Sequence, residues 1–393
     1  MSRPRVVHVT TTDISLELLL GPQLSAFIEA GYEVVGASAP GGFVPAIEAR
    51  GVRHVPLRHA TRAMAPTEDL RAIGELRRLF RELRPDIVHT HNPKPGLYGR
   101  LAARAAQVPV VVNTVHGLYA LPEDRLAKRA VVYSLERFAS TCSDAELVQN
   151  PEDLELLRST LRVPDRKLHL LGNGVDLMRF GPPRDGDERK RIRAALGIDD
   201  DQVVVGAVGR LVAEKGYPEL FRAWHDLGNV RSTATLLVVG PDDPDKSDAL
   251  DRDVVERARA DGVRFLGMRD DVEEIYRAMD VYVLASHREG YPRSAMEAAA
   301  SGLPVVATRI RGCRQVVDDG VTGHLVPVRN AAGLGDALGE LIGDAGLRER
   351  MGAAALERAR REFDQERVIA TTLNVYATQL RRVGRSAPRR APA

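Results

Sequence analysis

The chain of 393 residues is longer than one ordinary domain and is predicted to form two. Hydrophobic residues make up 44% of it and charged residues 28%, which excludes disordered and fibrous classes. The 56 basic and 54 acidic side chains leave a formal net charge of +2, too balanced for a protein that coats nucleic acid. An anionic ligand must therefore be bound by a local group of residues.

Cysteine content and apolar runs indicate the compartment. Cys142 and Cys313 are the two cysteines, and they offer neither a zinc spacing nor a disulfide framework. No apolar run approaches the ~18 residues of a membrane-spanning helix, and none follows the basic residues at the start. We therefore expect a cytoplasmic protein without a secretion signal or a membrane span.

Short apolar runs alternate with helix-length amphipathic segments, which predicts an α/β fold with parallel sheets. In the first half, the helices are expected at residues 15–30, 66–84 and 96–107, and the strands at 5–10, 33–37, 52–56, 86–90, 109–114 and 146–149. Several of these strands are almost continuously Val, Ile and Leu, so both faces of the sheet should be covered.

The second half repeats this pattern after a segment rich in Gly, Pro and charge. We expect a first domain over 1–180, a linker over 181–200 and a second domain over 201–363, followed by a helix over 364–382 and a disordered tail over 383–393. Strands are predicted at 202–208, 235–239, 263–266, 281–284, 304–307 and 324–326, and helices at 331–343 and 347–362. Ligands of open α/β sheets bind at the carboxyl ends of strands, so the site is expected between the two domains.

The densest chemical signal lies at residues 287–297, between a predicted strand and a predicted helix. Glu289 and Glu297 can accept hydrogen bonds from sugar or ribose hydroxyls, because carboxylates accept without donating. Backbone amides at the helix start can bind a diphosphate, and the candidates are Gly290, Tyr291 and Arg293. Taken alone, each carboxylate is equally consistent with a solvated acid at a helix start.

A second signal follows the first strand of the second domain. Residues 209–216 read Gly-Arg-Leu-Val-Ala-Glu-Lys-Gly and place two cations on a strand-to-helix loop. Arg210 can hold phosphate oxygens with two parallel hydrogen bonds, and Lys215 adds a point charge. Solvated surface charges are the alternative, but a position at a carboxyl strand end favours phosphate binding.

These motifs resemble those of glycosyltransferase family 4, the retaining nucleotide-sugar enzymes with the GT-B fold. The resemblance extends from about Val6 to about Asn374. Besides the two segments above, it rests on Gly-Asn-Gly-Val-Asp at 172–176 and Val-Arg-Phe-Leu-Gly at 263–267. It implies two Rossmann-like doubly wound domains facing across a cleft, with a helical C-terminal segment whose last helix returns to the first domain.

The resemblance also implies roles for individual residues. Arg210 and Lys215 would hold the donor diphosphate, and Glu289 with the amides after it would position the donor sugar. Glu297 would hold the ribose, and His116 would lie beside the transferred sugar. The nucleotide base would be read mainly by the backbone of Arg264, Phe265, Leu266, Gly267 and Met268.

Further candidates lie on loops after strands. Gly209 belongs to the donor site, and so does Gly21, although the loop before it lacks the paired glycines that are common in the family. The acceptor candidates are His91, Asn92, Lys94 and Asn173. His89 and His91 share one face of a strand, but two histidines without a third ligand are weak evidence for zinc.

The implied reaction is transfer of a hexose, with retention, from a nucleoside-diphosphate sugar, most simply a UDP-sugar. The acceptor would be a sugar or a polyprenyl-diphosphate-linked glycan, as in bacterial enzymes that build surface polysaccharides. Because two cations compensate the diphosphate, we expect no metal and no separate cofactor. The basic helix over 66–84 could contact an anionic membrane surface, although a solvated basic face explains it as well.

The sequence leaves other functions open. Natural-product glycosylation would use the same residues. A nucleotide-sugar epimerase can share the fold but needs acid and base groups aimed at a sugar carbon. A dehydrogenase is disfavoured, because no full Gly-x-Gly-x-x-Gly segment follows the first strand. A noncatalytic nucleotide-sugar sensor would keep the same binding residues.

Overall fold

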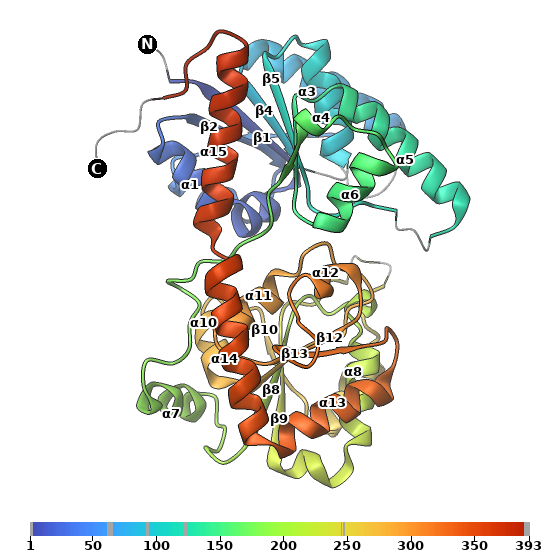
Figure 1. Ribbon diagram of the computed structural model, residues 1–393, viewed down its shortest axis with the longest axis vertical. Coiled ribbons are helices and arrows are strands. Elements are labelled where there is room, and N and C mark those ends of the chain that lie inside the picture. The colour runs from blue at the N-terminus through green and yellow to red at the C-terminus, as the bar shows by residue number, and fades with distance from the viewer. Residues whose placement is uncertain are drawn as a thin grey trace. The chain divides into compact units, whose positions relative to one another are not determined.

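The computed structural model describes residues 3–60, 66–91, 94–120, 124–244, 246 and 248–388. The chain forms two compact units, each an α/β sandwich of a parallel sheet between layers of helices (Figure 1). The first unit comprises Met1–Gly172 with Arg367–Ala393, and the second comprises Asn173–Glu366. The α/β fold class expected from the sequence is confirmed.

The first unit contains a seven-stranded parallel sheet with the order β3-β2-β1-β4-β5-β6-β7. Its strands are β1 Arg5–Thr12, β2 Glu33–Ala39, β3 Arg53–Pro56, β4 Ile87–His91, β5 Val110–Val115, β6 Ala145–Val148 and β7 Leu168–Leu170. Its helices are α1 Gly21–Glu29, α2 Val44–Ala49, α3 Pro66–Leu83, α4 Lys94–Ala105, α5 Leu126–Thr141 and α6 Pro151–Ser159, with a π-helical turn at Ser15–Leu19 before α1 and a 3₁₀ turn at Asp165–Lys167.

The second unit contains a six-stranded parallel sheet with the order β10-β9-β8-β11-β12-β13. Its strands are β8 Val203–Val208, β9 Ala234–Val239, β10 Arg264–Gly267, β11 Val281–Leu284, β12 Val305–Thr308 and β13 Gly323–Val326. Its helices are α7 Gly186–Ala195, α8 Tyr217–Asp226, α9 Arg252–Ala260, α10 Val272–Ala278, α11 Arg293–Ala300, α12 Arg311–Arg314, α13 Ala331–Gly343 and α14 Ala345–Glu362. Short 3₁₀ turns lie at Ala213–Lys215 and Gly228–Thr233, and α15 Gln365–Arg382 follows.

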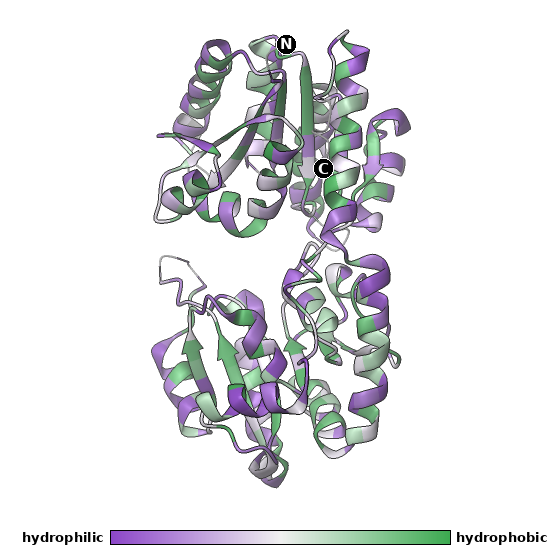
Figure 2. Ribbon diagram, turned by 90° about the vertical axis from the view of Figure 1, so that its left-hand side faces the viewer, coloured by the Kyte–Doolittle hydropathy of each residue, from purple (hydrophilic) through white to green (hydrophobic). Residues whose placement is uncertain are grey.

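Both sheets are covered on two faces, as their apolar strands predict. Successive residues of a strand point to opposite faces, and neighbouring residues accordingly join different cores. Val6 packs in the core beneath α1 and α15, whereas Val7 packs in the core beneath α3 and α4. Val204 and Val205 divide in the same way between the two cores of the second unit. Figure 2 shows the hydrophobic strands enclosed by helices of mixed polarity.

The two units are delimited differently from the domains expected from the sequence. Residues after Gly172 join the second unit, because Val175 exchanges backbone hydrogen bonds with Phe363 and Gln365 at 2.8 and 3.1 Å. The segment expected to be a linker contains α7. The buried Arg193 on that helix is ion-paired with Asp280 at 2.5 Å, which ties it to the second unit.

The C-terminal segment completes the first unit. From Arg367 onward α15 belongs to that unit, and Tyr376 on this helix is buried against Phe27 of α1. The expected disordered tail includes Arg385, which is ion-paired with Asp86, and Ala387, which packs on the same core. Residues 389–393 of that tail lie outside the described residues.

The strand order reverses once in each sheet, next to the first strand of the unit. In the first unit β1 lies between β2 and β4, and in the second β8 lies between β9 and β11. The connections leave in opposite directions at these points, which opens a crevice at the carboxyl ends of the two central strands. Searched over the described residues, the helices include none with the length and apolar character needed to cross a membrane.

A buried ion network joins α4, α5 and β6 in the first unit. Arg100 is fully buried and is ion-paired with Glu146 and Glu136, both at 2.8 Å. Asn113 donates a further hydrogen bond to Glu146 at 2.8 Å. Burial raises the pKa of Glu146, and Arg100 opposes that rise. The network holds α4 and α5 against the sheet only as long as its charges remain matched.

Replacing Arg100 with Met should lower the free energy of unfolding of the first unit by about 3–5 kcal/mol at pH 8, because Glu146 is left buried without a cation. The loss should be smaller at pH 5, since a carboxyl group with a raised pKa can take up a proton in the folded state. Urea denaturation followed by circular dichroism measures the effect, and fluorescence of Trp224, the single tryptophan, reports the second unit separately. Arg158→Met is the control, because its ion pair with Asp165 is exposed and its loss should change the free energy of unfolding far less.

Candidate functional site

The carboxyl edge of the second sheet brings together the two motifs singled out in the sequence. Lys215, after β8, is ion-paired with Glu289, after β11, at 2.6 Å. The hydroxyl of Ser286 donates to the same carboxylate at 2.8 Å. Residues 74 positions apart in the chain therefore form one polar cluster at the point where the strand order reverses.

Close backbone contact at this edge requires glycine. Gly216 has φ of +71°, and a Cβ atom there would lie 2.0 Å from the carbonyl oxygen of Ala285. The loop carrying Lys215 can therefore pack directly on the loop after β11. Tyr217 fixes the same loop, because its hydroxyl donates to the carbonyl of Gly209 at 2.9 Å. Burial raises the pKa of Tyr217, so this hydroxyl stays protonated as a donor.

Arg210 is paired with a residue that the sequence analysis did not select. Its guanidinium contacts Asp243 at 2.5 Å, and its side chain is 41% exposed. Asp243 and Asp245 form one of several Asp-x-Asp pairs in the sequence, and such pairs arise by chance in a chain with 54 acidic residues. Asp245 lies outside the described residues. The guanidinium is therefore neutralised by a carboxylate while it remains accessible from solvent.

Glu297 lies on α11, one turn beyond its start. It accepts a hydrogen bond from the hydroxyl of Tyr276 at 3.1 Å and lies 3.7 Å from the guanidinium of Arg293. Burial raises its pKa, and Arg293 and the Tyr276 hydroxyl oppose that rise. The carboxylate of Glu297 has a second oxygen and lies near a helix start, so it could accept hydrogen bonds from two neighbouring hydroxyls of a ligand.

The loop before α11 is held by the chain on both sides. The main chain of Glu289 passes so close to Gly312 that a Cβ atom on Gly312 would lie 2.7 Å from its carbonyl oxygen. The ring of Tyr291 packs edge-on against Phe363. The side-chain amide of Asn173 donates to the carbonyl of Tyr291 at 3.2 Å. Asn173 was expected among the acceptor residues of the first domain, and the structure instead places it in the second unit, beside the loop that carries Gly290.

The segment expected to read the nucleotide base forms β10 and the turn after it. The guanidinium of Arg264 donates to the carbonyls of Leu196 and Gly197, just after α7, the latter at 3.0 Å, so the side chain is already engaged. Phe265 packs edge-on against Phe221, and Leu266 is partly buried against the core. Gly267 accepts a hydrogen bond from Gly240 at 2.8 Å, and Met268 is 48% exposed. Backbone groups and the exposed Met268 thus remain for contacts with a ligand.

In the first unit, four histidines form a chain of hydrogen bonds. His8 of β1 lies 3.1 Å from His91 of β4, and His91 lies 3.0 Å from His116 after β5. Beyond His8 the chain continues through Tyr376 of α15 to His89, at 3.4 and 2.5 Å. The outer ends are Gln149, 3.2 Å from His116, and Thr114, 2.7 Å from His89.

One arrangement of protons satisfies this chain with neutral rings. If the amide oxygen of Gln149 accepts from Nδ1 of His116, then Nε2 of His116 accepts from Nδ1 of His91. The same direction continues through His8 to the hydroxyl of Tyr376. Both ring nitrogens of His116 are therefore engaged within the first unit, so a ligand could use them only by exchanging one of these bonds.

Burial keeps these histidines uncharged. It lowers the pKa of His8 to about 3 and that of His116 to about 4. Burial, together with the neighbouring histidines, lowers the pKa of His89 and His91 well below the ordinary value. His8 also supplies the third histidine that the sequence analysis missed, since nitrogens of His8, His89 and His91 lie within 4.8 Å of one another. Such a group could hold a metal ion, but only in exchange for the hydrogen bonds just described.

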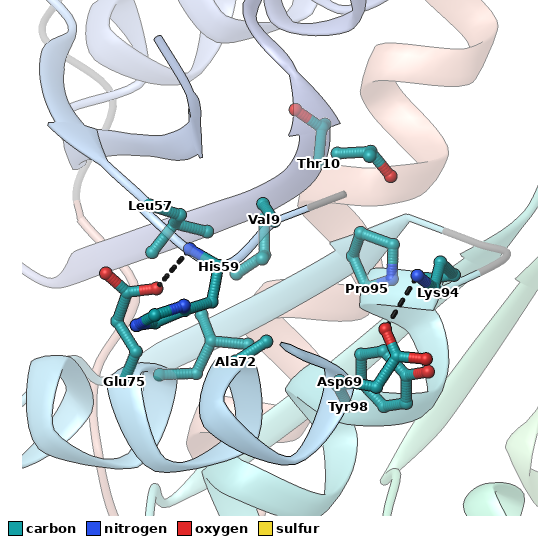
Figure 3. A pocket seen from close by; sticks show the side chains of 13 residues that line it. Val9, Thr10, Leu57, His59, Asp69, Ala72, Glu75, Lys94, Pro95 and Tyr98 are labelled. Carbon is teal, nitrogen blue, oxygen red and sulfur yellow. Dashed lines mark hydrogen bonds and ion pairs between the residues drawn. The ribbon is translucent and has the colours of Figure 1, made fainter. Parts of the chain in front are cut away.

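The reversal point of the first sheet carries a pocket, shown in Figure 3. It is a hollow, open to solvent, at the ends of β1 and β3 and beside α3 and α4. At one end of the pocket, Lys94 of α4 is ion-paired with Asp69 of α3 at 2.6 Å. Burial raises the pKa of Tyr98, and Asp69 raises it further. Thr10 and Glu75 add polar groups to the wall. Asn92, the neighbouring acceptor candidate, lies outside the described residues.

Gly21 has a structural environment of its own. It begins α1 after the π-helical turn, where a single helix over 15–30 was expected. The guanidinium of Arg50 would lie 3.1 Å from a Cβ atom on Gly21, and it is ion-paired with Glu17. Arg50 therefore covers the buried Gly21, and a role of Gly21 in donor binding stays a prediction.

Comparison with known proteins identifies the family. The model of glycosyltransferase family 4 matches residues 23–179, and that of glycosyl transferases group 1 matches residues 188–358. An Escherichia coli protein named UDP-Gal:alpha-D-GlcNAc-diphosphoundecaprenol alpha-1,3-galactosyltransferase is 32% identical over 280 residues, which are 70% of this chain and 71% of that protein. This chain belongs to glycosyltransferase family 4.

Other relatives of this glycosyltransferase extend over its full length. CapM of Staphylococcus aureus, a capsular polysaccharide biosynthesis glycosyltransferase, is 27% identical and covers 97% of this chain and 99% of its own. Among solved structures, Anabaena HepE in complex with UDP and glucose has a TM-score of 0.79 at 18% identity, over 96% of this chain and 100% of its own. A sucrose-phosphate synthase of Thermosynechococcus elongatus has a TM-score of 0.80 at 22% identity, over 97% and 100%. These structures establish the GT-B fold of the glycosyltransferase.

The buried histidines should make the first unit of this glycosyltransferase sensitive to acid. In the unfolded chain they take up protons near pH 6.5, whereas in the folded chain their lowered pKa values prevent this. The free energy of unfolding should therefore be highest above pH 6.5 and fall as the pH is lowered toward 4. Between pH 7.5 and 5.0, His8 alone should account for about 2 kcal/mol of that loss.

Urea denaturation of the His8→Asn variant at the two pH values tests this contribution. The variant should lose about 2 kcal/mol less than the wild type over this interval, whatever its stability at pH 7.5. His225→Asn is the control, because His225 is 62% exposed in the second unit. Equal losses in the wild type and the His8→Asn variant would contradict the assignment of a neutral, buried His8.

Proposed function

We propose that the protein transfers a hexose, with retention of the anomeric configuration, from a UDP-sugar to a sugar or lipid-linked acceptor. The observation that carries the proposal is the pair of carboxylate-bound cations, Arg210 and Lys215, after β8 at the reversal point of the second sheet. Glu297 lies on α11, which follows β11, the neighbouring strand at that point. This combination offers positive charge for a diphosphate and a carboxylate for a ribose at the edge where open α/β sheets bind nucleotides.

The cations suit a diphosphate because their present partners are single carboxylates. Asp243 holds Arg210 and Glu289 holds Lys215, so each ion pair is close to neutral before a donor binds. A diphosphate offers several oxygens in place of one carboxylate oxygen, and Arg210 can hold two of them at once. In the proposed donor complex, the diphosphate takes the place of Asp243 at Arg210, and Glu289 turns to the hydroxyls of the hexose.

The proposed chemistry places the main catalytic task on the leaving group. Arg210 and Lys215 stabilise the negative charge that develops on UDP as the bond to the sugar breaks. The acceptor hydroxyl attacks on the face from which UDP departs, and its proton passes to a phosphate oxygen of UDP. Retention then needs no enzymic nucleophile, and a metal is not required to balance the charge.

The acceptor is assigned to the first unit. The pocket of Lys94 and Asp69 presents paired donors and acceptors beside the ring of Tyr98, an arrangement suited to sugar hydroxyls. His116 would contact the transferred hexose by exchanging its bond to Gln149 or His91. The printed names of two relatives, from Escherichia coli and Campylobacter jejuni, specify diphosphoundecaprenol-linked acceptors, and the first also specifies UDP-Gal. They support a UDP-sugar donor and a lipid-linked acceptor. We further propose that the reaction takes place in the cytoplasm at the membrane surface.

Incubation of the purified protein with UDP-hexoses and a polyprenyl-diphosphate-linked sugar should yield an extended, α-linked glycan if the donor is an α-hexose. Mass spectrometry detects the product, and NMR coupling constants of the new anomeric proton give its configuration. Turnover should persist within about twofold in EDTA, because the cations carry the charge compensation. Inversion, loss of activity in EDTA, or an epimerised UDP-sugar without transfer would contradict the proposal.

A matched pair of variants tests the diphosphate site. Arg210→Ala should lower turnover about 100-fold or more and abolish the thermal stabilisation by UDP, because a preorganised charge is lost. Asp243→Asn should keep turnover and bind UDP more tightly, since the carboxylate that competes with the diphosphate is gone. Arg222→Ala on α8 is the control, because Arg222 is 78% exposed and should change neither property. A loss of UDP binding in Asp243→Asn equal to that in Arg210→Ala would contradict the competition between Asp243 and the diphosphate.

A further inference from the structure

Helix α5 carries large apolar side chains on its outer side. Leu126 is 77% exposed, Val131 60%, Leu135 43% and Phe138 56%. Val131, Leu135 and Phe138 follow one another at intervals of four and three residues, so they form one stripe along the helix. Leu126, nine positions before Leu135, lies on another side of the helix. We call Val131, Leu135 and Phe138 the apolar face of α5.

The fold does not use this face for its own core. The opposite side of α5 holds it to the first unit through the buried Ala139 and Ser140. Tyr133 packs there on the cluster of Leu118 and Leu157, and Glu136 turns inward to Arg100. Figure 1 shows α5 on the outer side of this unit. A soluble surface seldom gathers so many large apolar side chains without a partner.

Two exposed cations lie beside the apolar face. Lys128 and Arg137 are exposed and lie nine positions apart, which places them on opposite edges of the helix. The one acid within the helix, Glu136, is 15% exposed and ion-paired with Arg100. Asp124, just before the helix, is paired with Lys128 at 2.8 Å. The outer side of α5 is thus an apolar stripe with Arg137 on one edge and the ion pair of Lys128 with Asp124 on the other.

We propose that the apolar face of α5 docks on a membrane that contains anionic lipids. A helix with this pattern lies in the plane of the interface, with its apolar side chains among the acyl chains and its cations at the lipid headgroups. A second copy of the chain fits less well, because two such faces would bring Lys128 and Arg137 against cations of the same kind. Anionic headgroups complement them.

The position of α5 links this surface to the acceptor, and this step rests on the proposed function. The loop that precedes α5 begins with His116 directly after β5 and carries Tyr119, which is 55% exposed. The ammonium group of Lys128 lies 5.8 Å from the centroid of the Tyr119 ring, so the start of α5 contacts this loop. A docked α5 therefore holds the His116 loop at the depth of the headgroups, where the diphosphate of a lipid-linked acceptor lies.

Vesicle sedimentation of the full chain tests the docking. The wild type should bind vesicles of phosphatidylcholine with 30% phosphatidylglycerol, bind pure phosphatidylcholine vesicles at least 10-fold more weakly, and be released in part by 0.5 M NaCl. Leu135→Ser/Phe138→Ser should weaken binding at least 10-fold. Leu70→Ser, at a 70% exposed position of α3, and Met178→Ser, at a 94% exposed position of the second unit, should leave binding unchanged.

Three results would overturn the docking surface. These are equal binding of wild type and the α5 variant, loss of binding in Arg77→Gln/Arg81→Gln on α3 with α5 intact, and a dimer by light scattering that the α5 variant converts to a monomer. The changed positions on α5 are exposed, so thermal unfolding and the shift produced by UDP should match the wild type and exclude misfolding.

Activity assays separate this proposal from the proposed function. With an acceptor in vesicles, the α5 variant should turn over about 10-fold more slowly than the wild type, and with a short-chain acceptor free in solution the two should be equal. If the wild type binds anionic vesicles but transfers sugar to neither acceptor, the transferase proposal fails and the docking surface stands. If both proteins transfer equally well to vesicle-bound acceptor, the docking surface fails and the transferase proposal stands.

Discussion

Parallel strands that are covered on both faces can offer polar groups to a ligand only where they end. Each unit obeys this constraint, because helices cover both faces of its sheet. In each sheet the strand order reverses beside the first strand of the unit. Arg210 and Glu289 lie beyond the ends of β8 and β11, and Lys94 lies beyond the end of β4. The constraint thus fixes where charged side chains can reach a ligand, whatever chemistry they perform.

The charged side chains at these sheet edges form ion pairs. Arg210 with Asp243, Lys215 with Glu289, and Lys94 with Asp69 each place one cation against one carboxylate. A cation held in this way keeps its position when no ligand is present, so little side-chain entropy is lost on binding. A ligand must, however, compete with the resident carboxylate. Binding strength then depends on how much better a diphosphate serves the cation than a single carboxylate does.

Most strands and the two donor motifs could be predicted because their signals are local. A run such as Val203–Val208 is apolar throughout, which predicts a buried strand. Arg210 and Lys215 follow it within a few residues, so their place after the strand can be read from the sequence. Asp243 could not be assigned in the same way, since it meets Arg210 across 33 positions and resembles other acidic pairs. His8 was missed as a third histidine because it meets His91 across 83 positions. Helix α7 was not predicted, because the Gly, Pro and charged residues before it are typical of a linker. The ion pair between Arg193 and Asp280, which attaches this helix to the second unit, joins residues far apart in the sequence.

The return of α15 to the first sheet has a consequence for synthesis of the chain. The second unit is continuous from Asn173 to Glu366, so all of its core is present once that segment has left the ribosome. The first unit begins the chain, yet its core also needs Val368, Tyr376 and Leu380. Its sheet must therefore wait, with Phe27 and neighbouring side chains uncovered, while some two hundred further residues are translated. The part made first is the part finished last, and its uncovered face is where a nascent chain would meet a chaperone.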